Sequence, residues 1–307
     1  MANPLVCVYD DGSTKTPEER PLAAHMLLSV LSVLLNVSVT CFFLAYLVAL
    51  LLELSRVRWT IPGRFVAVLL MMSVGLLAHV SYLFLRVINS PTGNSSGLLS
   101  SWAEWSLLLA LGLAICFLIA FIRRPDTIIS FYFLPLVLFT IVVGTQLGSW
   151  EPFARDRAAD VWGIIHGLMM ALGTGAVLIG FLAGVMYLVQ SRRLKRKQLG
   201  GTQLRLPTLE TLDRTNRQAL VISTFAVAIG VVAGIIMNLN QTGKLNWSDS
   251  GIIFSFVLFA WLLVASAIEF FYSPASRGRK AFYMTLASLG FLLLALFSIV
   301  FSSHGVS

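Results

Sequence analysis

Long apolar stretches separated by short polar segments run through the whole 307-residue chain. A transmembrane helix needs about 20 predominantly apolar residues to cross a hydrocarbon core of roughly 30 Å. Eight stretches reach that length, at residues 26–52, 65–87, 102–122, 128–149, 162–189, 219–239, 251–271 and 281–303. The pattern therefore predicts an all-α polytopic membrane protein, with one integral membrane domain over residues 1–307 and a bundle of eight transmembrane helices.

Positively charged residues gather in alternate connections between these spans. Sixteen of the 22 Lys and Arg residues follow the first, third, fifth or seventh span, and six lie on the other side. Cytoplasmic loops carry the excess of Lys and Arg, so we expect both termini outside. The connection 191–217 is the longest on the basic side, and residues 206–212 within it predict a short capped helix lying along the membrane.

The composition excludes several classes of protein. Hydrophobic residues make up 57% of the chain and charged residues 12%, whereas a soluble domain carries about 25% charged residues. A soluble enzyme, a disordered chain and a small secreted scaffold are therefore excluded. Three distant cysteines without a CxxC pair favour no disulfide framework, zinc ribbon or covalent haem attachment. The net charge of +8 resides in the basic loops, so the expected partner is the lipid bilayer and not nucleic acid.

The four histidines, His25, His79, His166 and His304, all fall in the outer half of the predicted topology. His79 and His166 lie on the order of 10 Å below the outer boundary. Two imidazoles on facing helices can supply both axial ligands to the iron of a non-covalent b-type haem. The alternative is that each histidine hydrogen-bonds a neighbouring helix.

Other side chains near these histidines suit the same cofactor. Met169 and Met170 follow His166 by three and four residues, and they could pack on a macrocycle or offer a thioether. Arg86 lies two helical turns beyond His79, where its guanidinium could hold a haem propionate. Two arginines before the fifth span could do the same, Arg155 and Arg157.

Tryptophans and glycines allow simpler interpretations. Five tryptophans near the outer boundary are typical interfacial anchors: Trp102, Trp105, Trp150, Trp162 and Trp247. Three small-xxx-small pairs indicate close helix packing: Gly163/Gly167, Gly180/Gly184 and Gly230/Gly234.

Residues 165–172 and 187–195 resemble the cytochrome c assembly protein family, whose members handle haem. The likeness extends to residues 79–82, 99–105, 206–210, 254–262 and 277–280. The resemblance implies that His166 and His304 are outer haem ligands and that Glu104 is the acidic residue of the family. It also implies a bacterial cytoplasmic (inner) membrane location and other cytochrome c maturation proteins as partners.

Two departures place the chain nearest the HemX-like and YpjD-like branch of that family. The tryptophan-rich signature is reduced to residues 246–249, in which Trp247 stands alone, and Glu269 occupies a position where the family has an intramembrane histidine. The resemblance thus implies a haem-binding or haem-handling role in c-type cytochrome biogenesis or haem homeostasis, with no intact ligase motif and no expected enzymatic step. The ligand opposite His166 is either His304, by resemblance, or His79, by depth.

Two other functions compete with this one. A proton-coupled secondary transporter would use Glu104, Glu269 and His79 as a relay, although we find no paired Gly/Pro-interrupted spans of the kind that mark inverted repeats. A non-catalytic membrane scaffold would recruit a partner through residues 191–217.

Overall fold

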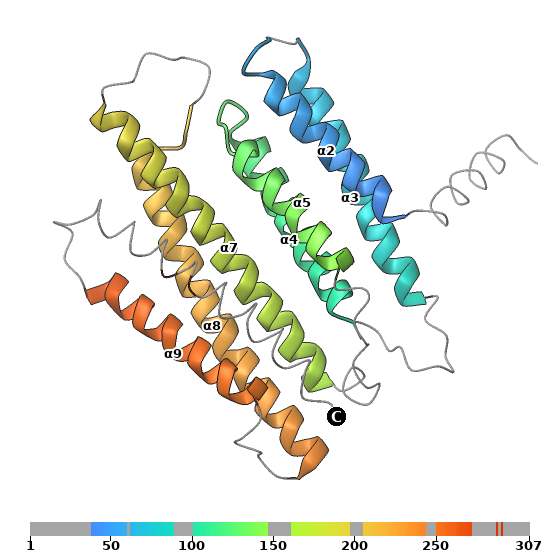
Figure 1. The fold of residues 1–307 in the computed structure, drawn as a ribbon, viewed down its shortest axis with the longest axis vertical. Helices are drawn as coiled ribbons and strands as arrows, with labels where there is room; N and C mark the ends of the chain where they lie inside the picture. The colour runs from blue at the N-terminus through green and yellow to red at the C-terminus, as the bar shows by residue number, and fades with distance from the viewer. Residues whose placement is uncertain are drawn as a thin grey trace, which may run out of the picture. The chain divides into compact units, whose positions relative to one another are not determined.

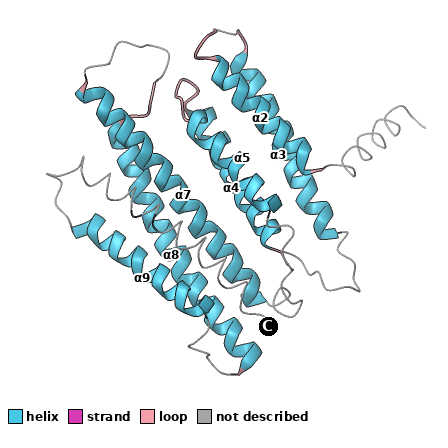
Figure 2. Cartoon of the chain, in the orientation of Figure 1, coloured by secondary structure: helices cyan, strands magenta, loops and turns pink. Residues whose placement is uncertain are grey.

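A computed structural model describes residues 38–59, 62–88, 101–146, 161–196, 205–243 and 250–271, together with residues 287 and 290. The helices in these ranges are α2 (Val39–Ser55), α3 (Arg64–Ile88), α4 (Trp102–Arg123), α5 (Ser130–Gln146), α7 (Val161–Lys195), α8 (Leu209–Thr242) and α9 (Ser250–Phe271) (Figure 1). No strand occurs in the described ranges (Figure 2). The all-α prediction is therefore confirmed for this part of the chain.

Four of these helices are long and apolar enough to cross a bilayer: Arg64–Arg86, Trp102–Arg123, Val161–Lys195 and Leu209–Asn240. Three shorter apolar stretches accompany them in α2, α5 and α9. The chain is thus a multi-pass membrane protein. Residues 26–37 of the first predicted span lie outside the described residues, and the eighth is described only at residues 287 and 290, both helical. The count of eight and the outside termini stay predictions.

The prediction of a separate helix along the membrane before the sixth span is wrong. Helix α8 begins at Leu209 and continues without a break into the apolar segment. The predicted cap is present, since the Thr208 hydroxyl accepts a hydrogen bond from the Thr211 backbone N–H. Residues 213–218 contain no Pro or Gly, so the capped first turn propagates. The helix ends at Gly243, whose φ of 66° suits a residue without a side chain.

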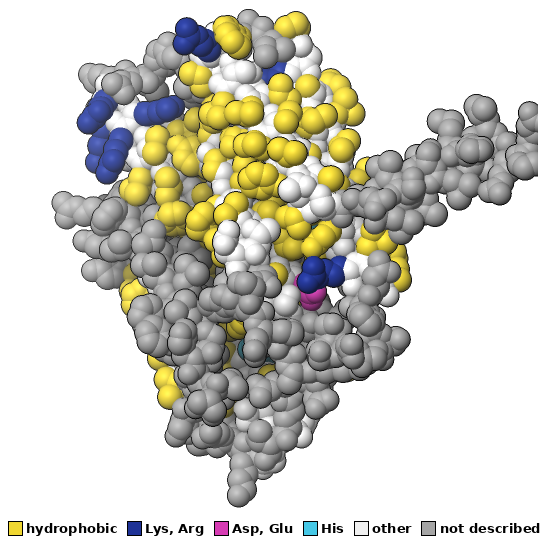
Figure 3. All heavy atoms as spheres, turned by 45° about the vertical axis from the view of Figure 1, so that its right-hand side comes forward, with side chains coloured by type: hydrophobic (Ala, Val, Ile, Leu, Met, Phe, Trp, Pro, Cys, Tyr) yellow, Lys and Arg dark blue, Asp and Glu magenta, His cyan; other side chains and the backbone are white. Residues whose placement is uncertain are grey.

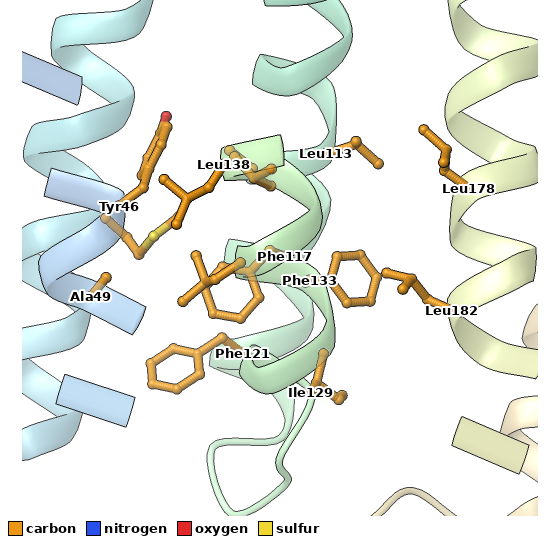
Figure 4. Packing of buried hydrophobic residues seen from close by; sticks show 14 of the residues in the cluster. Tyr46, Ala49, Leu113, Phe117, Phe121, Ile129, Phe133, Leu138, Leu178 and Leu182 are labelled. Atoms are coloured by element: carbon orange, nitrogen blue, oxygen red, sulfur yellow. The ribbon is translucent and has the colours of Figure 1, made fainter. Parts of the chain in front are cut away.

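The main hydrophobic core joins α2 to α7 through the α4–α5 pair. Helix α4 packs against α3, α5 and α7, while α2 packs against α3 and α5. Figure 4 shows Phe117 and Phe133, from α4 and α5, between Tyr46 of α2 and Leu182 of α7. A second cluster joins α7, α8 and α9. These interlocked apolar faces fix the positions of the polar side chains buried within them.

Three connections meet at one end of the described helices. The Arg56 guanidinium, after α2, donates to the Asp126 carbonyl in the α4–α5 connection over 2.8 Å. The Ile128 N–H donates to the Arg205 carbonyl, before α8, over 3.0 Å. Lys and Arg side chains gather at one end of the hydrophobic surface in Figure 3. We call the end formed by the α2–α3, α4–α5 and α7–α8 connections the basic end.

Candidate functional site

His166 lies five residues into α7, roughly 8 Å along the helix axis from its first residue. Its Nδ1 atom is 2.7 Å from the carbonyl oxygen of Gly230 on α8. A carbonyl oxygen can only accept a hydrogen bond, so Nδ1 carries the proton in this contact. A neutral imidazole in that tautomer has its lone pair on Nε2. His166 is thus both a helix-bridging residue and a nitrogen donor of fixed orientation.

Two glycines of α8 make room for side chains of α7. A Cβ atom at Gly234 would lie 2.8 Å from Nδ1 of His166, and one at Gly230 would lie 3.1 Å from the Sδ atom of Met170. His166 and Met170 therefore lie along the same seam between α7 and α8. Residues four apart on one helix lie on the same face about 6 Å apart, so these two side chains cannot bind opposite faces of one iron.

The start of α4 lies against the same turn of α7. A Cβ atom at Gly167 would come within 2.3 Å of Cζ2 of Trp105, so the indole ring covers the α7 backbone next to His166. Ser101 caps α4 by accepting a hydrogen bond from the Glu104 N–H. The cap fixes the first turn of α4 and with it the position of Trp105.

Arg86 and Glu104 form an ion pair between α3 and α4. The Nε atom of Arg86 donates to Oε1 of Glu104 over 2.8 Å, and its Nη1 donates to the Tyr82 hydroxyl over 3.1 Å. The guanidinium is half exposed, with a side-chain exposure of 50% against 13% for Glu104. The ion pair is therefore linked to the α7 turn that carries His166, because Glu104 precedes Trp105 in the first turn of α4 and Trp105 packs against that turn.

His79 lies in α3 on the side that faces α2 and α4, with no exposed surface. The Phe42 ring stacks on its imidazole at a centroid distance of 4.0 Å and an interplanar angle of 3°. The Tyr46 hydroxyl is 3.3 Å from Nδ1. The Nε2 atom is buried and makes no hydrogen bond in the described part of the chain. The backbone of Leu107, on α4, lies near the imidazole.

The two histidines have different surroundings. Among the described residues, the His79 ring contacts Phe42 and Tyr46 of α2, whereas the His166 ring contacts Gly230 and Gly234 of α8. His304 and Trp247 lie outside the described residues, as do Arg155 and Arg157. Glu269 lies in α9, but its side chain is also outside the description. Among the described residues, no group of three or more His, Cys, Asp or Glu side chains could hold a metal ion.

Glu53 is a buried polar residue that the sequence analysis missed. It has no exposed surface, accepts a hydrogen bond from the Ser130 hydroxyl over 2.6 Å, and lies 3.4 Å from Nε of Arg64. The pKa of nearby Arg56 lies below its usual value, mainly because the guanidinium is partly buried and also because the positive charge of Arg64 repels it. The predicted first span ended at residue 52, which placed Glu53 in a loop. The sequence does contain a signal for its burial, because Glu53 lies at helical spacing from Phe42, Tyr46 and Ala49 and so on the same face of α2.

These features define a multi-pass α-helical membrane protein that holds histidines inside its helix bundle. The family profile described as Cytochrome C assembly protein matches residues 67–307. The chain belongs to that family. Protein HemX of Bacillus subtilis (strain 168) is 28% identical to it over 132 residues, which cover 40% of this chain and 48% of HemX. The match thus spans about half the length of that relative. Membership associates the chain with the assembly of cytochrome c and with haem in general.

Proposed function

We propose that this protein binds a b-type haem non-covalently through Nε2 of His166 and supports c-type cytochrome biogenesis or haem homeostasis. The contact that carries the proposal is the 2.7 Å hydrogen bond from Nδ1 of His166 to the Gly230 carbonyl. Histidines that ligate a metal usually donate their other ring N–H to a carbonyl or a carboxylate, which fixes the tautomer and raises ligand basicity. The geometry of His166 fits that requirement.

The side chains near His166 suit the other parts of a haem, which are its apolar ring and its propionates. Trp105 offers an aromatic surface next to the α7 turn, and Met170 adds a flexible apolar side chain along the same seam. Arg86, half exposed, can keep Glu104 as a partner and still donate to a propionate, because a guanidinium has five N–H donors. Haem would supply the redox-active iron, while the chain binds and orients it.

The second axial ligand is proposed to be His304 or His79. The resemblance favours His304. His79 is supported by its buried, unpartnered Nε2 atom, since a nitrogen without a hydrogen-bond partner in an apolar surrounding is costly unless it has another role. Trp247 would serve as an aromatic contact on the same side, by family likeness alone.

The location proposed is the bacterial cytoplasmic membrane, with both termini outside. In that orientation the basic end faces the cytoplasm, as the excess of Lys and Arg requires, and His166 lies toward the outer surface. The protein would hold haem for transfer to partner maturation proteins, without catalysing the covalent attachment of haem to a cytochrome.

An optical spectrum of the detergent-purified protein tests haem binding. Protein from haem-replete cells is expected to show a Soret band and, after reduction, two visible bands, with the haem extractable by acidified solvent because it is non-covalent. His166→Ala should remove most of the bound haem. Leu168→Ala is the matched control, because Leu168 is an exposed residue of the same turn of α7. A featureless wild-type spectrum, or one that His166→Ala leaves unchanged, overturns the proposal.

The second ligand is tested in the same preparation. His304→Ala and His79→Ala are compared with the wild type by electron paramagnetic resonance of the oxidised protein. Loss of one of two axial imidazoles converts a low-spin signal to a high-spin one, and the variant that causes this change identifies the ligand. If neither variant alters the signal, both assignments are wrong.

A further inference from the structure

The imidazole of His166 occupies the space in which a side chain of residue 234 would lie. A Cβ atom at Gly234 would be 2.8 Å from Nδ1 and 3.1 Å from Cε1 of His166. Real Cβ atoms essentially never approach other heavy atoms to 2.8 Å, so any side chain at position 234 has to displace this ring. The absence of a side chain is therefore a condition for the observed position of the imidazole.

The carbonyl of Gly230, one helical turn before Gly234, is the second feature of α8 that holds the His166 imidazole in place. It accepts the Nδ1–H of His166 over 2.7 Å. The hydrogen bond fixes the rotation of the ring, and Gly234 allows the ring to come close enough to make it. The direction of the Nε2 lone pair is determined by both conditions together.

We propose that Gly230 and Gly234 of α8 position His166, so that a neutral imidazole presents Nε2, and not Nδ1, to haem iron. This inference rests on the proposed function for its ligand, but the positioning itself is a property of the protein without haem. Gly234 acts through His166 and does not touch the cofactor. The sequence alone assigns the same glycines to helix packing.

The other glycines of the α7–α8 interface show what ordinary packing is like. A Cβ atom at Gly173 would lie 2.8 Å from Cγ2 of Val227, and one at Gly180 would meet Ala219 and Asn216 at 3.2 Å. Neither contact involves His166. Gly173→Ala creates a clash of the same size as Gly234→Ala but leaves His166 and its hydrogen bond untouched, so this variant is the control for packing between α7 and α8.

Haem binding by Gly234→Ala and Gly173→Ala is the first measurement. Gly234→Ala is expected to weaken haem binding by about 10- to 100-fold, the effect seen when a ligating histidine loses the hydrogen-bond partner of its other ring nitrogen. Gly173→Ala should bind haem as tightly as the wild type. The haem that Gly234→Ala retains should show altered resonance positions in electron paramagnetic resonance, since the plane of the axial imidazole has turned. Equal effects of the two variants contradict the proposal.

A double-mutant cycle in haem-free protein separates positioning from packing. Gly234→Ala should lower the melting temperature in the wild-type background. In a His166→Ala background the same substitution should be neutral or stabilising, because the ring is gone and alanine is a better helix residue than glycine. If Gly234→Ala remains equally destabilising without His166, the glycine serves helix packing alone and the inference fails.

The cycle also keeps the two proposals distinguishable. A wild-type protein that binds no haem, yet shows coupling between residues 166 and 234, refutes the proposed function and the assignment of Nε2 to iron while leaving the positioning contact intact. A protein that binds haem through His166 but shows no coupling refutes only the inference about Gly234.

Discussion

The carboxylate of Glu53, near the end of α2, accepts a 2.6 Å hydrogen bond from the hydroxyl of Ser130, the first residue of α5. The acid is thus held at a helix N-terminus, where the partial positive charge of the helix dipole favours an anion. Arg64 contributes its charge at 3.4 Å. These neighbours offset part of the cost of burying the side chain between three helices at the basic end, where Oε1 of Glu53 and Nε of Arg64 make no hydrogen bond in the described part of the chain.

Removal of the Glu53 carboxylate should strongly destabilise the bundle. Glu53→Ala leaves the Arg64 charge without its partner, and breaking a buried ion pair costs about 3–5 kcal/mol. The free energy of unfolding in mixed micelles measures the effect. Glu104→Ala, which removes the ion pair to the half-exposed Arg86, is the control and should cost about 0–1 kcal/mol. If the two variants lose similar amounts of unfolding free energy, the burial of Glu53 does not determine how much its ion pair contributes to stability.

Gly75 and Gly112 should respond in opposite ways to substitution by alanine. A Cβ atom at Gly75 would lie 2.7 Å from Cε1 of Tyr46, whereas one at Gly112 meets nothing within 4 Å. Gly75→Ala should therefore lower the unfolding free energy by about 1–3 kcal/mol. Gly112→Ala should raise it by about 0.5–1 kcal/mol through helix propensity. A stabilising Gly75→Ala would mean that α2 and α3 pack less closely than described.

Gly167 should tolerate no side chain while Trp105 is present. The ring atoms of Trp105 lie 2.3–2.8 Å from a Cβ atom at this position, and a rigid indole cannot yield by a small rotation. Gly167→Ala should destabilise the protein by about 1–3 kcal/mol. Gly175→Ala, which meets only the end of Leu109 at 3.1 Å, is the control. Adding Trp105→Leu to Gly167→Ala should restore most of the loss in melting temperature, and no recovery would argue against the contact.

His79 and Tyr46 should behave as a coupled pair. His79→Phe leaves the Tyr46 hydroxyl buried without its partner, at a cost of about 1–3 kcal/mol. His79→Phe with Tyr46→Phe removes both partners and should stay within about 1 kcal/mol of the wild type. Thermal unfolding measures both variants. A double variant that is less stable than His79→Phe alone contradicts this assignment.

Arg86 should affect haem retention more than stability. Arg86→Gln removes a half-exposed ion pair, with an expected loss of about 0–1 kcal/mol in unfolding free energy. If Arg86 holds a propionate, the same variant should release haem faster, as followed by transfer to an apo-globin. Arg58→Gln, an exposed arginine at the basic end, should release haem at the wild-type rate. Equal rates for all three proteins would exclude the propionate contact.

Several elements of the fold follow from local sequence. The spans predicted at 65–87 and 102–122 agree with α3 (Arg64–Ile88) and α4 (Trp102–Arg123) within one residue at each end. The first and last residues of such a helix can be predicted where arginine or a capping serine bounds the apolar run. Within the membrane, backbone hydrogen bonds are satisfied inside the segment itself, and its side chains have to be apolar. Helix α8 shows the limit of that argument, since a polar first turn continued into the membrane span where a separate helix was expected.

The sequence by itself determined that this chain is an all-α, multi-pass membrane protein and that Lys and Arg are concentrated in alternate connections between its apolar stretches. Only the tertiary structure decided which faces of the helices pack together. In it, Glu53 is buried and hydrogen-bonded to Ser130, His79 stacks against Phe42, and His166 is hydrogen-bonded to the Gly230 carbonyl. The reason is that apolarity is a property of each segment alone. The rotation of a helix about its axis depends on the side chains of the neighbouring helices, 64 residues away for the contact between His166 and Gly230.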